Sequence, residues 1–325
     1  MSEGAEVDQV LLVREAELRR RRDGAEYLRL SLGDRTGAVA AVVWDGVADC
    51  APHARPGAPA RVVGRFAQHP RYGAQITVRT IAPPAPGSFA LDDLLDGPPK
   101  GCDQMETELR ELVGTVREPH LRALLDRVFG EGSELWARFR EAPAAKHYHQ
   151  AYRHGLLEHA LSVGQAAHLL CATFPGIDHD VAVTGALLHD IGKLDAYASS
   201  PPAAIDLTGA GRLQGEIPLG YYRVRRLCEE IEGFPPHLAE HVAHIILSHH
   251  GSLEHGSPVV PCTREATLVH FLDNLGGRLG SFDRLEKELP DGAAWSPFDR
   301  ALGGGAYFAA RAVPAADGEP AREAA

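Results

Sequence analysis

The stretch VAVTGALLHDIGKLD at residues 181–195 constrains the fold of this chain more than any other part of the sequence. Its apolar residues follow helical spacing, which predicts a helix that faces the protein interior and delivers His189 and Asp190 at its end. Lys193 follows about one helical turn later. Burying a carboxylate without a partner costs free energy. The sequence therefore predicts a compensating group beside Asp190, and a metal ion is the strongest candidate.

Length and composition are those of an ordinary globular protein. The 325 residues, with 44% hydrophobic and 24% charged content, suffice for two domains with a buried core. No apolar run reaches membrane-spanning length, and the acidic N-terminus lacks a signal-peptide core, so we expect no membrane partner. The five cysteines are scattered and form no CxxC pair, which favours a reducing, cytoplasmic location and argues against a zinc ribbon.

The charge distribution leaves a nucleic-acid partner open. A formal net charge of −11 would ordinarily disfavour such a partner. Residues 1–90, however, hold 12 Arg against 10 Asp and Glu, so the negative charge belongs to the rest of the chain. Bound divalent cations would partly neutralise that acidic part.

Residues 1–85 are expected to form a small β-barrel of the OB-fold type. Segments with alternating or β-branched apolar residues are separated by turn residues: YLRLSLGD, GAVAAVVWD, ARVVGRFAQ and AQITVRTI. Four or five such strands over about eighty residues are typical of this barrel. Residues 86–103 are rich in Pro and Gly and are predicted to be a linker.

Aromatic and basic side chains of such a barrel can bind single-stranded nucleic acid by stacking on bases and contacting phosphates. Tyr27 and Trp44 are possible members of this surface, and the residues selected as nucleic-acid-binding are Arg65, Phe66, Arg71 and Tyr72. The alternative for Trp44 and Phe66 is that they fill the barrel core.

Residues 104–290 follow a helical pattern and are expected to form an all-α domain, followed by a C-terminal extension at 291–325 whose end is predicted to be disordered.

All but two of the 17 histidines lie from His120 to His270. Four helical stretches place potential ligands among apolar residues: His159, His189 with Asp190, His249 with His250, and Asp273. Imidazole and carboxylate groups bind Mn²⁺, Fe²⁺ or Zn²⁺ where thiolates are absent, and a two-metal site needs several of them. Taken jointly, these residues predict a shared metal centre, because the alternative must compensate several buried polar groups separately.

The motifs resemble those of a known family. LLEHA, LLHDIGK, ILSHHG and the aspartate of HFLDNL are similar to the HD-domain metal-dependent phosphohydrolase superfamily. The stretches AAKHYHQAYRHGLLEHALSV and LSHHGSLEHGSPVVPCTREATLVHFLDNL resemble, more narrowly, the YhaM-type 3′→5′ exoribonucleases, which also place an OB-fold before the HD domain. The resemblance covers roughly residues 5–290 and implies hydrolysis of single-stranded RNA, or DNA, by a metal-activated water.

The resemblance also implies individual roles. The residues that match metal ligands of the family are His159, His189, Asp190, His249, His250 and Asp273. Lys193 matches the lysine that steadies the substrate phosphate, and His149 lies in a segment characteristic of the family. Independently of the resemblance, which has a glycine at position 154, His149 and His154 are candidates for protonating the leaving oxygen.

Glu216 departs from the family, which normally presents a histidine at this position. Its carboxylate can bind a hard cation through oxygen and favours Mn²⁺ or Mg²⁺ over softer metals, or it weakens the second site. We therefore expect one or two divalent cations, with Mn²⁺ first and Mg²⁺, Fe²⁺ or Co²⁺ as alternatives.

Two other functions stay open on the sequence alone. The same HD core can hydrolyse a small nucleotide or a cyclic dinucleotide, with the barrel as a regulatory domain. The chain can also be a non-catalytic single-strand-binding protein with a structural metal. The sequence decides neither the oligomeric state nor the choice between RNA and DNA.

Overall fold

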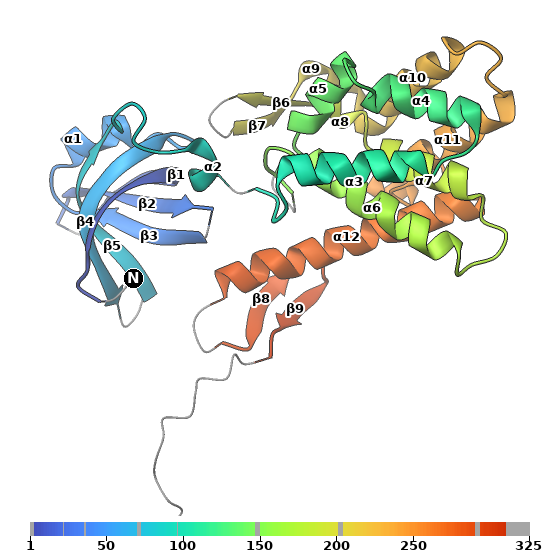
Figure 1. Ribbon diagram of the computed structural model, residues 1–325. Helices are drawn as coiled ribbons and strands as arrows, with labels where there is room; N and C mark the ends of the chain where they lie inside the picture. Colours follow the sequence, from blue (N-terminus) through green and yellow to red (C-terminus); the bar gives the residue numbers. More distant parts are fainter. Residues whose placement is uncertain are drawn as a thin grey trace, which may run out of the picture.

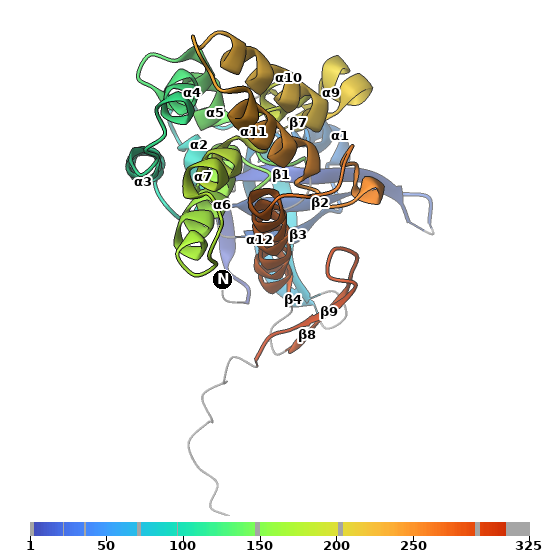
Figure 2. The same ribbon diagram turned by 90° about the vertical axis from the view of Figure 1, so that its right-hand side faces the viewer.

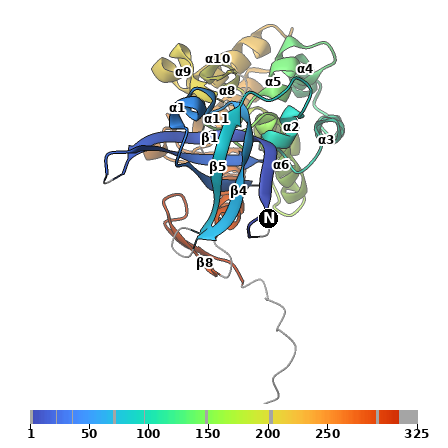
Figure 3. The ribbon, with the colours of Figure 1, turned by 90° about the vertical axis from the view of Figure 1, so that its left-hand side faces the viewer.

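The computed structural model describes residues 3–21, 23–35, 37–69, 73–95, 97–146, 150–200, 204–289 and 293–309. In Figure 1 a β-barrel lies on one side, a helical domain on the other, and a small hairpin lies beneath the last helix. Figure 3 looks at the barrel, with strands β1, β4 and β5 in front of the helices.

The N-terminal part is a closed five-stranded barrel. Its strands are β1 (Glu6–Arg20), β2 (Glu26–Asp34), β3 (Gly37–Val43), β4 (Pro59–His69) and β5 (Gly73–Ala82). Strand β1 pairs antiparallel with both β2 and β4, and β3 runs parallel to β5, which closes the sheet in the order β1-β2-β3-β5-β4. The expected OB-like barrel is thereby confirmed.

The barrel core is made by alternate residues of these strands, and Leu32, Val43, Val62 and Ile76 are fully buried in it. Between β3 and β4 the chain forms two short turns of helix, α1 (Val47–Cys50) and η1 (Ala51–His53). Strand β1 is not among the four segments with a clear sequence pattern. Its second half, from Arg14 to Arg20, has exposed or half-buried positions only, so no apolar alternation marks it.

The predicted linker packs against the barrel. It contains one helical turn, α2 (Leu91–Leu94), whose Leu94 is buried. The backbone N–H of Arg35 donates to the carbonyl oxygen of Asp93 at 3.0 Å, which ties this turn to the end of β2.

The helical domain surrounds α7 (His179–Leu188). Every residue from Val181 to Leu188 is buried, which is typical of a helix enclosed by other helices. The elements around it are α3 (Cys102–Gly114), α4 (Pro119–Phe129), α5 (Glu134–Glu141), α6 (Gly155–Cys171), α8 (Lys193–Ala196), α9 (Gly209–Gln214), α10 (Glu216–Glu229), α11 (Pro236–Ser248), η2 (Leu253–His255) and α12 (Arg264–Glu288). In Figure 2, α12 is seen almost end-on beside α6 and α7.

Two β-hairpins accompany the helices. Strands β6 (Tyr197–Ser200) and β7 (Ala204–Leu207) interrupt the region expected to be all-α. The sequence between the two strands contains Pro201 and Pro202, and proline disfavours a continuous helix through this region. Strands β8 (Trp295–Asp299) and β9 (Gly304–Tyr307) form a second hairpin in the C-terminal extension. The end of that extension, predicted to be disordered, lies outside the described residues.

No helix among the described residues is long and apolar enough to cross a lipid bilayer.

Candidate metal centre

The central helix α7 delivers His189 and Asp190 into the middle of the helical domain. Gly185 allows α11 to approach α7 closely, because a Cβ at this position would lie 2.2 Å from Cδ1 of Ile245. His189 caps the helix end, and its Nδ1 donates to the carbonyl oxygen of Ala186 at 2.7 Å. This hydrogen bond leaves Nε2 as the lone-pair nitrogen, directed into the site. His189 and Asp190 are 1% and 2% exposed.

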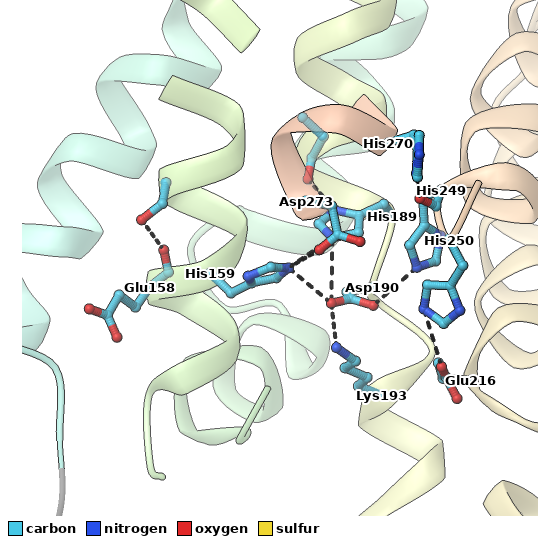
Figure 4. A network of polar contacts seen from close by, with 12 residues as sticks. Glu158, His159, His189, Asp190, Lys193, Glu216, His249, His250, His270 and Asp273 are labelled. Atoms are coloured by element: carbon cyan, nitrogen blue, oxygen red, sulfur yellow. Dashed lines mark hydrogen bonds and ion pairs between the residues drawn. The ribbon is translucent and has the colours of Figure 1, made fainter. Parts of the chain in front are cut away.

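Three helices place potential ligands around one point (Figure 4). Nε2 of His159, on α6, lies 3.3 Å from Oδ2 of Asp190 and 3.1 Å from Oδ1 of Asp273, on α12. It also lies 3.0 Å from Nε2 of His189. Ligand atoms of His159, His189 and Asp273 all lie within 4.8 Å of one another. The structure thus brings together four residues that are up to 114 positions apart in the sequence, as predicted.

A second group lies on the other side of the Asp190 carboxylate. Nε2 of His249 lies 3.5 Å from Oδ1 of Asp190, and both atoms are buried without a hydrogen-bond partner in the part of the chain that the structure describes. His250 follows, with its Nε2 3.7 Å from Oε1 of Glu216. Asp190 therefore directs one oxygen to each group, so this one carboxylate could serve as a ligand for cations held by either group.

Gly192 explains how Lys193 and Glu216 reach the site. A Cβ on Gly192 would lie 1.9 Å from the carbonyl oxygen of Glu216, so only glycine allows this contact with the start of α10. Lys193 begins α8, and its Nζ lies 2.5 Å from Oδ2 of Asp190. The lysine side chain is 15% exposed.

Burial and charge set the protonation of the cluster. Burial alone would raise the pKa of Asp190, but the charge of Lys193 and the hydrogen bond from His159 hold it well below its usual value. Asp273 follows the same pattern: burial opposes ionisation, and the hydrogen bond and charge of His159 lower its pKa. Burial disfavours the imidazolium of His159, yet Asp190 and Asp273 raise the pKa of this residue to about 9. Both carboxylates are therefore ionised at neutral pH.

Backbone contacts orient the remaining histidines. Nδ1 of His249 donates to the carbonyl oxygen of Ile246 at 2.8 Å, and Nδ1 of His250 donates to that of His255 at 2.9 Å. His270 adds a contact that the sequence did not predict: its Nδ1 donates to the carbonyl oxygen of His249 at 2.7 Å. Gly251 makes room for that ring, because a Cβ there would lie 2.0 Å from it. Such contacts fix which ring nitrogen faces a metal.

The donor set fits a divalent cation. His189 presents a lone pair to Nε2 of His159 at 3.0 Å, and the unpartnered pair of Asp190 and His249 lies beside them. The facing lone pairs of His159 and His189 repel one another, as do those of Asp190 and His249. A proton on His159 or a cation between the side chains is needed to relieve this repulsion. Mixed imidazole and carboxylate ligands without thiolate suit Mn²⁺, Fe²⁺, Co²⁺ or Zn²⁺.

His154, one of the two predicted general acids, makes no contact with this network among the described residues. His154 lies at the start of α6 with φ of 68°, and its Nδ1 lies 2.5 Å from the carbonyl oxygen of Arg140 and 3.5 Å from Sγ of Cys102. His149 lies outside the described residues.

The predicted nucleic-acid surface is described only in part. Arg65 is exposed on β4, with its Nε donating to the carbonyl oxygen of Gly4 at 3.1 Å, whereas Phe66 is half-buried and packs against the barrel core. Arg71 and Tyr72 lie outside the described residues.

Trp44 does not fill the barrel. It is 39% exposed and stacks on Tyr27 with a ring-centroid distance of 5.0 Å. The guanidinium of Arg21 lies 4.6 Å from the indole centroid. These three residues form an aromatic and basic group on the barrel surface.

Comparison with known proteins agrees with the geometry. Residues 156–277 match the family described as HD domain. The chain is 29% identical over 289 residues to the 3′-5′ exoribonuclease YhaM of Bacillus subtilis (strain 168), covering 88% of this chain and 90% of the relative. It is 28% identical over 289 residues to the YhaM protein of Geobacillus sp. (strain WCH70), covering 88% and 87%.

A solved structure is also similar to part of the chain. The second OB-fold domain of replication protein A from Methanococcus maripaludis shares 25% identity, covers 27% of this chain and 88% of its own, and has a TM-score of 0.20.

The family match includes His159, His189, Asp190, His249 and Asp273. Residues 156–277 therefore match the HD domain family, in a chain that is similar over most of its length to proteins named 3′-5′ exoribonuclease YhaM.

Proposed function

We propose that this protein is a metal-dependent 3′-5′ exoribonuclease. The observation that carries the proposal is the buried Asp190 carboxylate, with one oxygen among His159, His189 and Asp273 and the other facing His249. The relatives are named 3′-5′ exoribonucleases, which indicates the direction of degradation and the substrate class.

The residues that would hold the cations fall into two sets that share Asp190. One set is His159, His189, Asp190 and Asp273, and the other is Asp190, His249, His250 and Glu216. A divalent cation bound there supplies Lewis-acid activation of a water molecule and of the phosphoryl oxygens. We propose Mn²⁺, because Glu216 adds a hard oxygen ligand to the second set.

Lys193 is proposed to stabilise the negative charge of the phosphate during the reaction. Its ammonium forms an ion pair with Asp190 at the inner edge of the site. Burial would lower the pKa of Lys193, but the charge of the Asp190 carboxylate outweighs burial and raises it. Lys193 therefore carries a full positive charge at neutral pH. A fixed charge in a partly buried site is more effective than one in water, because it needs no reorganisation.

The chemistry is an in-line displacement at phosphorus. A water oxygen loses one proton to solvent and forms a bond to phosphorus, the bond between phosphorus and the 3′ oxygen breaks, and the 3′ oxygen takes up a proton from a side-chain acid. The proposed proton donors are His149 and His154, and His154 would act through Nε2 because Nδ1 faces Arg140 and Cys102.

The barrel is proposed to bind single-stranded RNA ahead of the site. Arg65 presents an exposed guanidinium, and the group of Tyr27, Trp44 and Arg21 adds aromatic area. The five free cysteines support a further proposal, that the protein acts in the reducing cytoplasm.

Digestion of a single-stranded RNA labelled at its 5′ end tests the proposal. With Mn²⁺ we expect a ladder of shortened, still-labelled products and release of nucleoside 5′-monophosphates. Asp190→Asn, which keeps the side-chain shape, should abolish the ladder. Intact RNA combined with hydrolysis of a cyclic dinucleotide would instead assign a small-nucleotide phosphohydrolase. Binding of RNA without any cleavage would assign a non-catalytic binding protein.

A further inference from the structure

Helix α12 carries an exposed apolar stripe. Phe271, Leu275, Leu279 and Phe282 are 64%, 51%, 54% and 36% exposed, and they follow one another at spacings of four, four and three residues. This spacing places them along one face of the helix. We call these four residues the α12 stripe. Large apolar side chains that lie together on a surface mark an interaction site more often than single exposed ones do.

The stripe faces away from the metal centre. At about 100° of rotation per residue, the four positions lie between roughly 160° and 240° around the helix from Asp273. Asp273 points to His159, so the stripe occupies the other side of α12. It is therefore not a path for substrate into the site.

The β8–β9 hairpin adds a second aromatic surface at the same helix. Its buried residues are Ser296 and Ala306, whereas Trp295, Phe298 and Tyr307 are 63%, 74% and 57% exposed. Trp295 and Tyr307 are cross-strand partners with ring centroids 5.0 Å apart. A two-stranded hairpin is marginally stable by itself. Packing of these aromatics against another surface would stabilise it.

We propose that the α12 stripe and the aromatic face of the β8–β9 hairpin bind a second copy of this chain. The five exposed aromatic side chains alone offer on the order of 600 Å² of surface, taking about 200 Å² for each ring side chain and the exposed fractions above. A stable interface buries about 800 Å² on each partner, and the two leucines add to the aromatic area.

A second copy is the occupant that these features favour. An apolar face is self-complementary, and a two-fold axis pairs the same patch on both subunits, as in most homo-oligomers. Each copy carries a net charge of −11, so two copies repel one another, and burial of the apolar surface must outweigh that repulsion. The same negative charge disfavours an anionic membrane surface.

Sedimentation velocity of the full-length protein at about 20 μM tests the proposal. We expect a mass near twice the 34.9 kDa of one chain. The double variant Leu275→Glu with Leu279→Glu should sediment as a monomer. Leu213→Glu is the matched control, because Leu213 is 87% exposed on α9, outside the stripe, and it should keep the mass of the wild type. A monomeric wild type, a double variant with unchanged mass, or a monomeric Leu213→Glu would overturn the proposal.

A crosslinking measurement covers the case in which the double variant fails to fold. In a Cys262→Ser background, which removes the exposed native thiol, Leu279→Cys should form a disulfide-linked pair under mild oxidation. Leu213→Cys in the same background should not. Equal crosslinking of both variants, or of neither, would contradict an interface at the stripe.

Discussion

Nε2 of His249 and Oδ1 of Asp190 lie 3.5 Å apart inside the helical domain, and neither atom has a hydrogen-bond partner among the described residues. A buried polar atom without a partner costs about 1–3 kcal/mol. The fold holds both atoms in place through the α7 and α11 helix ends, which His189 and His249 cap with their own Nδ1 hydrogen bonds. A cation bound between the two atoms would satisfy both of them, which supports the proposed second metal set.

Replacement of Lys193 should reduce turnover more than binding. Lys193→Met keeps much of the packing but removes the ammonium that lies 2.5 Å from Asp190. We expect kcat for Mn²⁺-dependent RNA hydrolysis to fall about 10²–10³-fold, since the lost interaction stabilises charge on the phosphate. Lys193→Arg should recover part of the loss because it restores the charge. A kcat for Lys193→Met within twofold of the wild type would remove Lys193 from the mechanism.

Exchange of Glu216 for histidine should change the preferred metal. The carboxylate of Glu216 lies 3.7 Å from Nε2 of His250 and is the oxygen ligand proposed for the second set. Imidazole favours softer cations, so Glu216→His should lower the ratio of Mn²⁺-supported to Co²⁺-supported activity several-fold. Glu216→Gln retains the shape without the charge and should weaken binding of the second ion. An unchanged metal ratio in Glu216→His would place Glu216 outside the site.

Removal of Arg65 from the barrel should weaken the binding of long single-stranded RNA. Its guanidinium is exposed, whereas Arg61 on the same strand forms two hydrogen bonds of 2.7 Å with Asp8. We expect Arg65→Ala to reduce the slope of log Kd against log salt concentration by about 1. Arg61→Ala is the matched control and should leave the slope unchanged. Equal effects of the two substitutions would show that the slope reports only total charge.

Metal binding should release a proton from His159. In the metal-free protein burial lowers the pKa of this imidazole, but Asp190 and Asp273 outweigh burial and raise the pKa to about 9, above the usual 6.5. The imidazolium therefore stabilises the metal-free fold fully below about pH 6.5, and this contribution is lost as the pH rises through 9. A cation must displace that proton, so Mn²⁺ affinity should rise by up to roughly tenfold per pH unit over the same range.

Calorimetry in two buffers of different ionisation enthalpy at pH 7.5 measures this proton. The wild type should release about one proton for the first Mn²⁺ bound. The variant His159→Gln, which has no titrating imidazole, should release correspondingly fewer. Mn²⁺ binding whose affinity does not change between pH 6.5 and 9 would show that His159 is neutral before the metal arrives.

The sequence predicts the centre of this molecule better than its surface. The run from Val181 to Asp190 is local, continuous and apolar, so both the buried helix and the acid at its end follow from it. The contact of His270 with the carbonyl oxygen of His249 could not be predicted, because a backbone acceptor has no signature in the residue types. The α12 stripe is equally hidden, since Leu275 and Leu279 show the same apolar spacing as a buried helix face.

The parts that sequence patterns missed in the fold have a similar physical cause. Strand β1 forms because β2 and β4 flank it on both sides, although half of its residues are polar. Hairpin β6–β7 consists of two strands of four residues, which is too short for a period of two to be recognised. Tertiary pairing, which the local sequence does not encode, determines both elements.

The Mn²⁺ content of the purified protein, measured by elemental analysis after dialysis, tests the central claim most directly. The wild type should retain one to two Mn²⁺ per chain, and Asp190→Asn, folded as judged by circular dichroism, should retain close to none, because both ligand sets share this carboxylate. Wild-type Mn²⁺ content in a folded Asp190→Asn would contradict a metal centre built on Asp190.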